Sequence, residues 1–145
     1  MMRVLATIVA CAAALCGCAT AVDSYVTEIR GGVWSDPVEV ILPNRDTLGL
    51  YDLRIALRHD GRLVGERVEM TVMTVTPDSL WVEERMTMTL ADDGRSRSLQ
   101  HEASGIYRRN VRFAHEGCYR MIIAPVRPVC GVEAVGVDMS KSDKE

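Results

Sequence analysis

The residues with the clearest chemical potential lie at the end of the first apolar run, in the stretch LCGCAT at residues 15–20. Cys16 and Cys18 stand there, at the place where a secretion signal is normally cleaved. A cysteine in this position can accept a lipid, form half of a disulfide or bind a metal ion. The residues that precede it decide among these three possibilities.

The chain opens with a basic residue, Arg3, which is followed by 14 uncharged residues at positions 4–17. A membrane-spanning helix needs about 20 apolar residues, so this run is too short to span a bilayer. A basic start and a short apolar run are typical of a secretory signal peptide. We therefore expect residues 1–17 to be a signal peptide that is removed and never joins the fold.

Leu15, Cys16, Gly17 and Cys18 match the bacterial lipobox, in which an aliphatic residue, a small residue and Gly or Ala precede the acceptor cysteine. The acceptor thiol is the nucleophile that takes a thioether-linked diacylglycerol. Cys18 is thus the predicted lipidation site. Cys16 is a poorer acceptor, because bulky Leu15 would stand directly before it. An ordinary signal peptide with incidental cysteines is the remaining alternative.

Lipidation at Cys18 would make the lipid bilayer a partner of this chain, since two or more acyl chains give stable anchoring. Ala19, Thr20 and Ala21 follow without an acidic residue, whereas surface-exported lipoproteins often carry an acidic stretch there. We therefore expect an outer-membrane anchor on the periplasmic face. The loss of Arg3 changes the net charge from −3 to −4, and this acidic balance gives no support for nucleic-acid binding.

The mature chain is long enough for one domain with one core. Residues 18–32 end in Gly31-Gly32 and predict a lipidated N-terminus and tether, residues 33–139 predict the domain, and residues 140–145 predict a polar tail. Apolar and polar residues alternate through the domain, and no segment has a sustained helical period. Strands are expected at residues 38–42, 51–58, 67–75, 81–90, 105–114, 118–123 and 129–137.

Seven or eight short strands separated by turns predict an all-β fold. The expected form is a single-domain antiparallel β-sandwich, with the jelly roll as one type of it, and a closed barrel is the alternative. Because aromatic residues make up only 5% of the chain, methionines and β-branched residues must fill much of the core.

Cys118 and Cys130 lie inside the predicted domain, in a compartment that permits disulfides. If residues 118–123 and 129–137 form a hairpin, the two cysteines lie roughly opposite each other, which makes them a candidate disulfide. Two free buried thiols are the alternative. A catalytic pair of Cys118 and His115 is disfavoured, since their spacing places them on opposite faces of a strand.

The remaining polar residues predict no enzyme, metal site or cofactor. His59, His101 and His115 lack the close ligand pairs typical of zinc sites. Glu83 and Glu84 are adjacent, so on a strand their side chains diverge and do not form an acid–base pair.

Two basic groups have two interpretations each. Arg58 and His59 end a predicted strand before a turn. They are either a solvated strand end, with Arg58 paired to a carboxylate, or a recognition site. Arg108 and Arg112 share one face of a strand, where they either pair with the protein's own carboxylates or meet an anionic partner.

A lone Trp precedes the first expected strand, a Tyr-led strand ends in Leu-Arg-His, and the C-terminal strand carries a Gly-Val and Val-Gly pattern. This layout resembles the gliding-motility lipoprotein GldH family of Bacteroidetes, and the resemblance covers nearly the whole chain. The matching positions are Trp34, Tyr51, Leu57, Arg58, His59, Gly131, Val132, Val135 and Gly136.

The resemblance implies a non-catalytic, membrane-anchored accessory protein of the gliding machinery or of related envelope machinery, with a protein partner in the envelope. Trp34, Arg58 and His59 are the candidate recognition residues. The alternative is an extracytoplasmic lipoprotein that binds a glycan or another small ligand. Trp34 and Trp81 are the candidate aromatic platforms for it, and burial of both would count against a glycan site.

Overall fold

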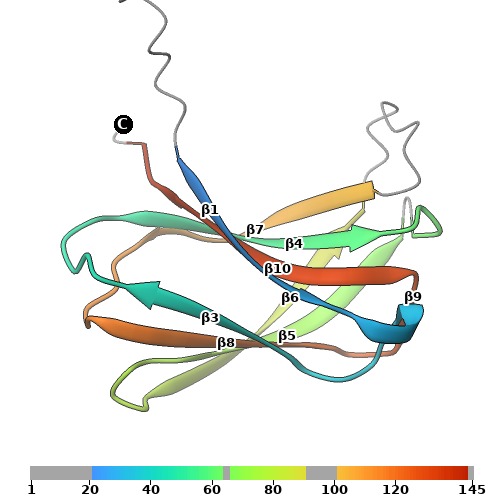
Figure 1. The fold of residues 1–145 in the computed structure, drawn as a ribbon, viewed down its shortest axis with the longest axis horizontal. Coiled ribbons are helices and arrows are strands. Elements are labelled where there is room, and N and C mark those ends of the chain that lie inside the picture. Colours follow the sequence, from blue (N-terminus) through green and yellow to red (C-terminus); the bar gives the residue numbers. More distant parts are fainter. Residues whose placement is uncertain (1–20, 64–65, 91–100, 144–145) are drawn as a thin grey trace, which may run out of the picture.

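The computed structural model describes residues 21–63, 66–90 and 101–143, so the predicted signal peptide 1–17 and Cys18 lie outside the described residues. Two four-stranded antiparallel sheets pack face to face as a sandwich (Figure 1). Within the described ranges, the only helical segment is the short 3-10 turn η1 (Arg30–Gly32). No helix in them is long and apolar enough to cross a membrane.

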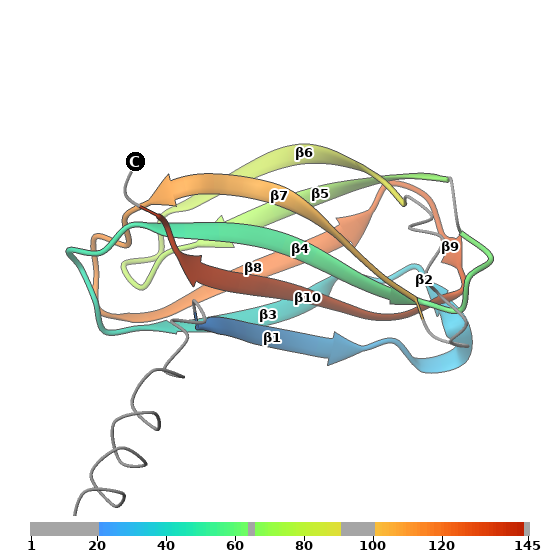
Figure 2. The same cartoon turned by 90° about the horizontal axis from the view of Figure 1, so that it is seen from above.

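The predicted antiparallel β-sandwich is confirmed, and the alternative of a closed barrel is wrong. The described strands are β1 (Val22–Glu28), β2 (Val33–Trp34), β3 (Val38–Asn44), β4 (Tyr51–His59), β5 (Arg67–Val75), β6 (Trp81–Thr89), β7 (His101–Val111), β8 (Gly117–Pro125), β9 (Val129–Cys130) and β10 (Val132–Lys141). One sheet has the order β1-β10-β4-β7 and the other β3-β8-β5-β6, and the short pair β2-β9 lies at one end (Figure 2).

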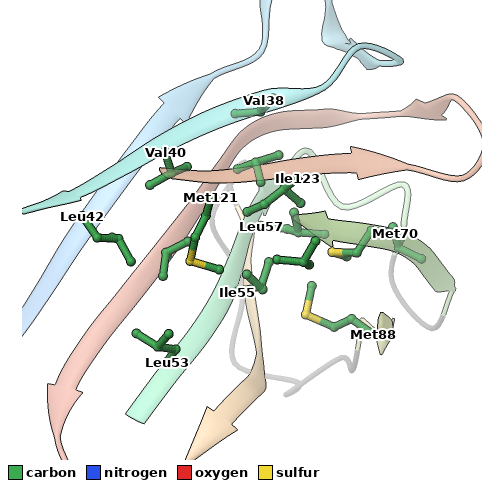
Figure 3. Packing of buried hydrophobic residues seen from close by; sticks show 14 of the residues in the cluster. Val38, Val40, Leu42, Leu53, Ile55, Leu57, Met70, Met88, Met121 and Ile123 are labelled. Carbon is green, nitrogen blue, oxygen red and sulfur yellow. The ribbon is translucent and has the colours of Figure 1, made fainter. Parts of the chain in front are cut away.

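Alternating residues of both sheets form one core between them. Leu53, Ile55 and Leu57 of β4 are all at most 4% exposed, as the alternation in this strand predicts. Met70 and Met121 of the facing sheet are fully buried and point toward these residues (Figure 3). Methionines and β-branched residues thus fill much of the core, as expected. Each such side chain contributes about 1.5–3 kcal/mol by leaving water.

The expected tether at residues 18–32 differs from the structure, because β1 takes up Val22–Glu28 of this range and pairs with β10. At the other end β10 continues to Lys141, so the sandwich extends beyond the expected 33–139 on both sides. The alternation in β1 is weak because Tyr25 is its one large side chain packed against the core. Its other apolar residues, Val22 and Val26, are each 55% exposed.

β1 makes hydrogen bonds to both sheets. Its seven residues lie in register with β10, and the hydroxyl of Ser24 donates a hydrogen bond to Asp138 at 2.7 Å. The hydroxyl of Thr27 crosses to the other sheet and donates to the carbonyl oxygen of Glu39 at 3.1 Å. β1 and β3 therefore close one long side of the sandwich.

The hairpin that we expected between residues 118–123 and 129–137 is wrong. β8 lies in one sheet and β10 in the other, because the chain crosses between the sheets after β8. The expected second strand is also interrupted, since Gly131 has a φ of +92° and separates β9 from β10. A positive φ favours glycine, which explains why the break falls at this residue.

The close approach of β1 to β10 can be tested at Gly136. A Cβ atom at this position would lie 2.8 Å from the carbonyl oxygen of Tyr25. We expect Gly136→Ala to lower the free energy of unfolding by about 1–3 kcal/mol, because backbone must move. Hydrogen exchange should show lost protection of the β1 amides.

Gly105→Ala is the matched control, on β7 at the other edge of the same sheet. Its Cβ would meet only the flexible side chains of Met86 and Met88, at 3.0 Å. This variant should keep β1 protected. Unchanged β1 protection in Gly136→Ala would contradict the described pairing.

Candidate functional site

The strand order gives the sandwich two distinct ends. At the N-terminal end β1 starts at Val22, and the loops 45–50, 76–80 and 112–116 join strands there (Figure 1). At the opposite end, the far end, β4 finishes at His59 and β2 pairs with β9. The candidate residues from the sequence divide between these two ends.

His59 lies in the interior at the far end and is 2% exposed. Its ring stacks on that of His101, with centroids 5.4 Å apart and the planes 18° from parallel. The backbone N–H of Gly61 donates to His59 Nδ1 at 3.1 Å. Because Nδ1 accepts this bond, the neutral ring carries its proton on Nε2.

The pKa of His59 is lowered from its ordinary value of 6.5. Burial is the largest cause, and the neighbouring His101 adds to it, whereas Asp60 and Glu133 act in the opposite direction. Burial disfavours the charged form of an imidazole. His59 is therefore a neutral structural residue near neutral pH and not a solvated strand end.

Arg58 lies beside His59 but on the outer face, where it forms ion pairs with Glu28 at 3.5 Å and with Glu133 at 3.8 Å. This matches the interpretation in which Arg58 pairs with a nearby carboxylate. Trp34 is 1% exposed, and its indole N–H donates to the carbonyl oxygen of Asp36 at 3.1 Å. Of the three candidate recognition residues, only Arg58 offers surface to a partner.

Cys118 and Cys130 are free and exposed, and they lie at opposite ends of the sandwich. Cys118 pairs with Pro43 near the N-terminal end, and Cys130 pairs with Val33 at the far end. The seven residue steps from Cys118 to Pro125 alone cover about 23 Å of strand. A disulfide needs Cα atoms within about 7 Å, so the candidate disulfide does not form in this fold. The alternative of buried thiols is also wrong.

A cleft of about 370 Å³ opens between β6 and β7, the outer strands that lie side by side in Figure 2. Leu53 and Met121 lie at its base, and Arg109 and Arg112 belong to its lining. Whereas β1 and β3 close the opposite side of the sandwich, this side holds a cleft that a polar bridge crosses, and Met86 and Met88 of β6 pack near Gly105 of β7 beyond it.

The bridge joins Glu84 of β6 to two neighbouring residues of β7. The hydroxyl of Tyr107 donates to one carboxylate oxygen at 2.8 Å, and the guanidinium of Arg108 binds the other. Arg108 holds the pKa of the Glu84 carboxyl below its ordinary value, with a further contribution from Tyr107. Burial, followed by Glu84, raises the pKa of Tyr107.

Adjacent strand residues normally point to opposite faces, yet Tyr107 and Arg108 reach the same carboxylate. The register between β4 and β7 shifts on either side of Leu53, which marks bulges in β7. A bulge re-aims side chains in this way. Arg108 is ion-paired, which matches the interpretation in which it pairs with the protein's own carboxylates, whereas Arg112 makes no ion pair with any residue that the structure describes.

Sequence reasoning missed Glu84 as a bridging residue, although it separated Glu83 from Glu84. The available signal was an acidic residue on the apolar face of the strand at 81–90, in line with Met86 and Met88.

Trp81 begins the same strand and is 68% exposed, so one of the two tryptophans is on the surface. Trp81 does not line the cleft. Three or more metal-ligating side chains do not gather anywhere in the described part of the chain.

Comparisons of this chain with protein families and with curated proteins found no match. The likeness to the GldH family therefore rests on the short motifs alone. Several of those motif residues are interior, among them Trp34, Leu57, His59, Val132 and Val135, each at most 2% exposed. Residues at such positions contribute to the packing of the sandwich and do not by themselves form a contact surface.

The buried neutral state of His59 predicts a pH-dependent stability. The unfolded chain binds a proton at His59 near pH 6.5, whereas the folded chain, with its lowered pKa, does not. The contribution is therefore fully present above the unfolded pKa and is lost as pH falls through the folded pKa. We expect urea unfolding to show a free energy of unfolding that falls as the pH drops below about 6.5, by at most about 1.4 kcal/mol per pH unit.

His59→Gln should flatten the curve in this window. The control His115→Gln, which alters a half-exposed side chain, should keep the dependence of the unaltered protein. A curve for His59→Gln that still falls as steeply would show that another group titrates there.

Proposed function

We propose that this chain is a lipid-anchored, non-catalytic protein of the bacterial envelope, held at the periplasmic face of the outer membrane through Cys18. It acts as an accessory component of gliding-motility or related envelope machinery. The lipobox at residues 15–18 and the motif likeness to the GldH family support this proposal. The single structural observation that carries it is the position at which the fold begins.

β1 starts at Val22, four residues after Cys18. Four residues span at most about 14 Å when fully extended. An acylated Cys18 would therefore hold the sandwich directly against the bilayer and not on a long tether. Such a placement suits a protein that keeps a fixed position in a membrane-associated assembly.

The strand order supports the jelly-roll type of sandwich. The chain crosses from one sheet to the other at nearly every connection between its long strands, and only β5 and β6 follow each other within a sheet. Repeated crossing of this kind is what two Greek keys wound into a jelly roll require. In this arrangement the first and last long strands, β1 and β10, lie side by side.

A protein partner would find its best contact at β6. This outer strand is nine residues long and mostly exposed, and its first residues, Trp81 and Val82, are 68% and 52% exposed. An outer strand can accept a further strand from a partner, with backbone hydrogen bonds giving affinity. Glu83 and Arg85 on the outer face would then select among partners by charge.

A small-ligand function is the second candidate, and the cleft between β6 and β7 favours it. The cleft combines apolar side chains such as Leu53 with three arginines: Arg108, which is bound to Glu84, and Arg109 and Arg112. The burial of Trp34 removes one of the two aromatic platforms that a glycan site would use. Binding of an anionic amphiphile that is lost in Arg112→Gln would favour this second candidate.

The proposal predicts the fate of a Cys18→Ala variant in a bacterial host. The native protein should begin at Cys18, carry the mass of its acyl chains and sediment with the membrane. Cys18→Ala should stall uncleaved or appear in the soluble fraction, because the acceptor thiol is absent. Intact mass together with membrane fractionation measures both.

Cys16→Ala is the matched control and should leave processing unchanged. An unacylated mature chain cut at another residue would overturn the proposal. Cross-linking of the acylated protein in whole envelopes, compared with a Trp81→Glu variant, then tests whether the partner contacts β6.

A further inference from the structure

Exposed apolar side chains gather at the N-terminal end of the sandwich. The largest exposed fractions among the described large apolar residues belong to Leu48 at 80%, Trp81 at 68% and Leu80 at 66%. All three stand in or beside the loops 45–50 and 76–80, at the end where β1 begins (Figure 1). Among the residues that the structure describes, the far end offers Val33 and Val126 in this class, each 41% exposed.

The loop that carries Leu48 is held by one carboxylate. Asp46 Oδ1 accepts the backbone N–H groups of Leu48 at 3.0 Å and Gly49 at 2.9 Å, and its Oδ2 accepts the hydroxyl of Tyr51 at 2.9 Å. Lys141 at the end of β10 adds an ion pair at 3.9 Å. Leu48 therefore projects from an ordered turn.

The loop that carries Leu80 is ordered as well. The hydroxyl of Thr76 accepts the backbone N–H of Leu80 at 3.1 Å, and the N–H of Thr76 donates to the Leu80 carbonyl oxygen at 2.8 Å. Ser79 adopts a positive φ of 68° to close the turn. Asp78 bonds to the Thr76 hydroxyl, so its charge is engaged within the loop. Both leucines are thus presented with little remaining freedom to lose on binding.

We propose that the N-terminal end of the sandwich docks on the phospholipid bilayer, with Leu48, Leu80 and Trp81 entering the interfacial region. This inference rests on the proposed lipid anchor, which would place that end within about 14 Å of the acylated cysteine. Leucine side chains gain free energy by leaving water at the acyl boundary, and Trp is enriched at the level of the headgroups.

Cationic groups at this end fit the same surface, which they share with the exposed carboxylates Asp23, Glu116 and Asp143. Arg45, Arg112 and Lys141 are exposed there and can meet lipid phosphates. The acidic residues of the two loops, Asp46 and Asp78, are occupied by internal bonds that lower the pKa of both carboxyls. A protein partner at the same leucines is the competing occupant, and vesicles without any other protein distinguish the two.

The test uses the mature, acylated protein in vesicles of phosphatidylethanolamine and phosphatidylglycerol, and reads tryptophan fluorescence. Trp34 is 1% exposed and serves as an internal reference, so a change in emission reports Trp81. We expect a blue-shifted Trp81 emission that brominated lipids quench. Trp81→Phe should remove the quenched component and confirm its source.

The double variant Leu48→Ser with Leu80→Ser should lose most of this quenching while remaining acylated. Its matched control, Val33→Ser with Val126→Ser, changes two exposed aliphatic residues at the far end and should quench like the unaltered protein. Circular dichroism and urea unfolding would show that both double variants stay folded. All four substitutions replace exposed side chains, for which stability changes are usually within about 0.5 kcal/mol.

An acylated protein whose Trp81 emission is neither shifted nor quenched would overturn the docking inference. Equal losses in the two double variants would overturn it as well. Either result leaves the lipid anchor standing, because intact mass establishes acylation separately. A chain that carries no acyl mass contradicts the anchor itself.

Discussion

The antiparallel pairing of β1 with β10 is the constraint on which the rest of this arrangement depends. All seven residues of β1 are in register with β10, and the backbone of β1 approaches Gly136 so closely that no Cβ atom fits between them. The hydroxyl of Thr27 adds a bond to the opposite sheet. This pairing makes the first strand part of the core domain, and it fixes the end of the sandwich at which β1 begins.

The two long sides of the sandwich differ because the outer strands differ. β1 and β3 are joined directly across one side, whereas β6 and β7 meet across the other through Glu84, Tyr107 and Arg108. The second side therefore keeps a cleft that an ion pair bridges, and it also holds β6, whose residues are mostly exposed. The proposed partner and ligand contacts both fall on this side, since β6 is the last strand of its sheet and the cleft lies beside it.

Much of the fold follows from the alternation of side chains. Leu53, Ile55 and Leu57 are buried as their spacing predicts, because a strand between two neighbours in one sheet must place every second residue in the core. β1 was missed because an outer strand with only Tyr25 facing inward has little apolar periodicity. The incorrect hairpin between β8 and β10 shows a different limit, since local spacing does not tell which sheet a strand joins.

The site was less predictable than the fold. His59 is polar and stands before a turn, which indicates exposure, but stacking on His101 from another strand buries it. The bridge at Glu84 depends on bulges in β7, and a bulge is set by pairing with β4. The candidate disulfide between the two cysteines depends on a hairpin that does not form in this fold. In each case a contact between residues far apart in the sequence overrides the local pattern.

The orientation of the sandwich relative to the bilayer decides whether the N-terminal end faces the membrane, and the two native thiols can measure it. Cys118 lies near the N-terminal end and Cys130 at the far end, and both are exposed. A donor dye on one thiol, with the other changed to Ser, would transfer energy to acceptor lipids in vesicles that carry the acylated protein. We expect clearly higher transfer from Cys118 than from Cys130, and equal or reversed transfer would contradict docking through the N-terminal end.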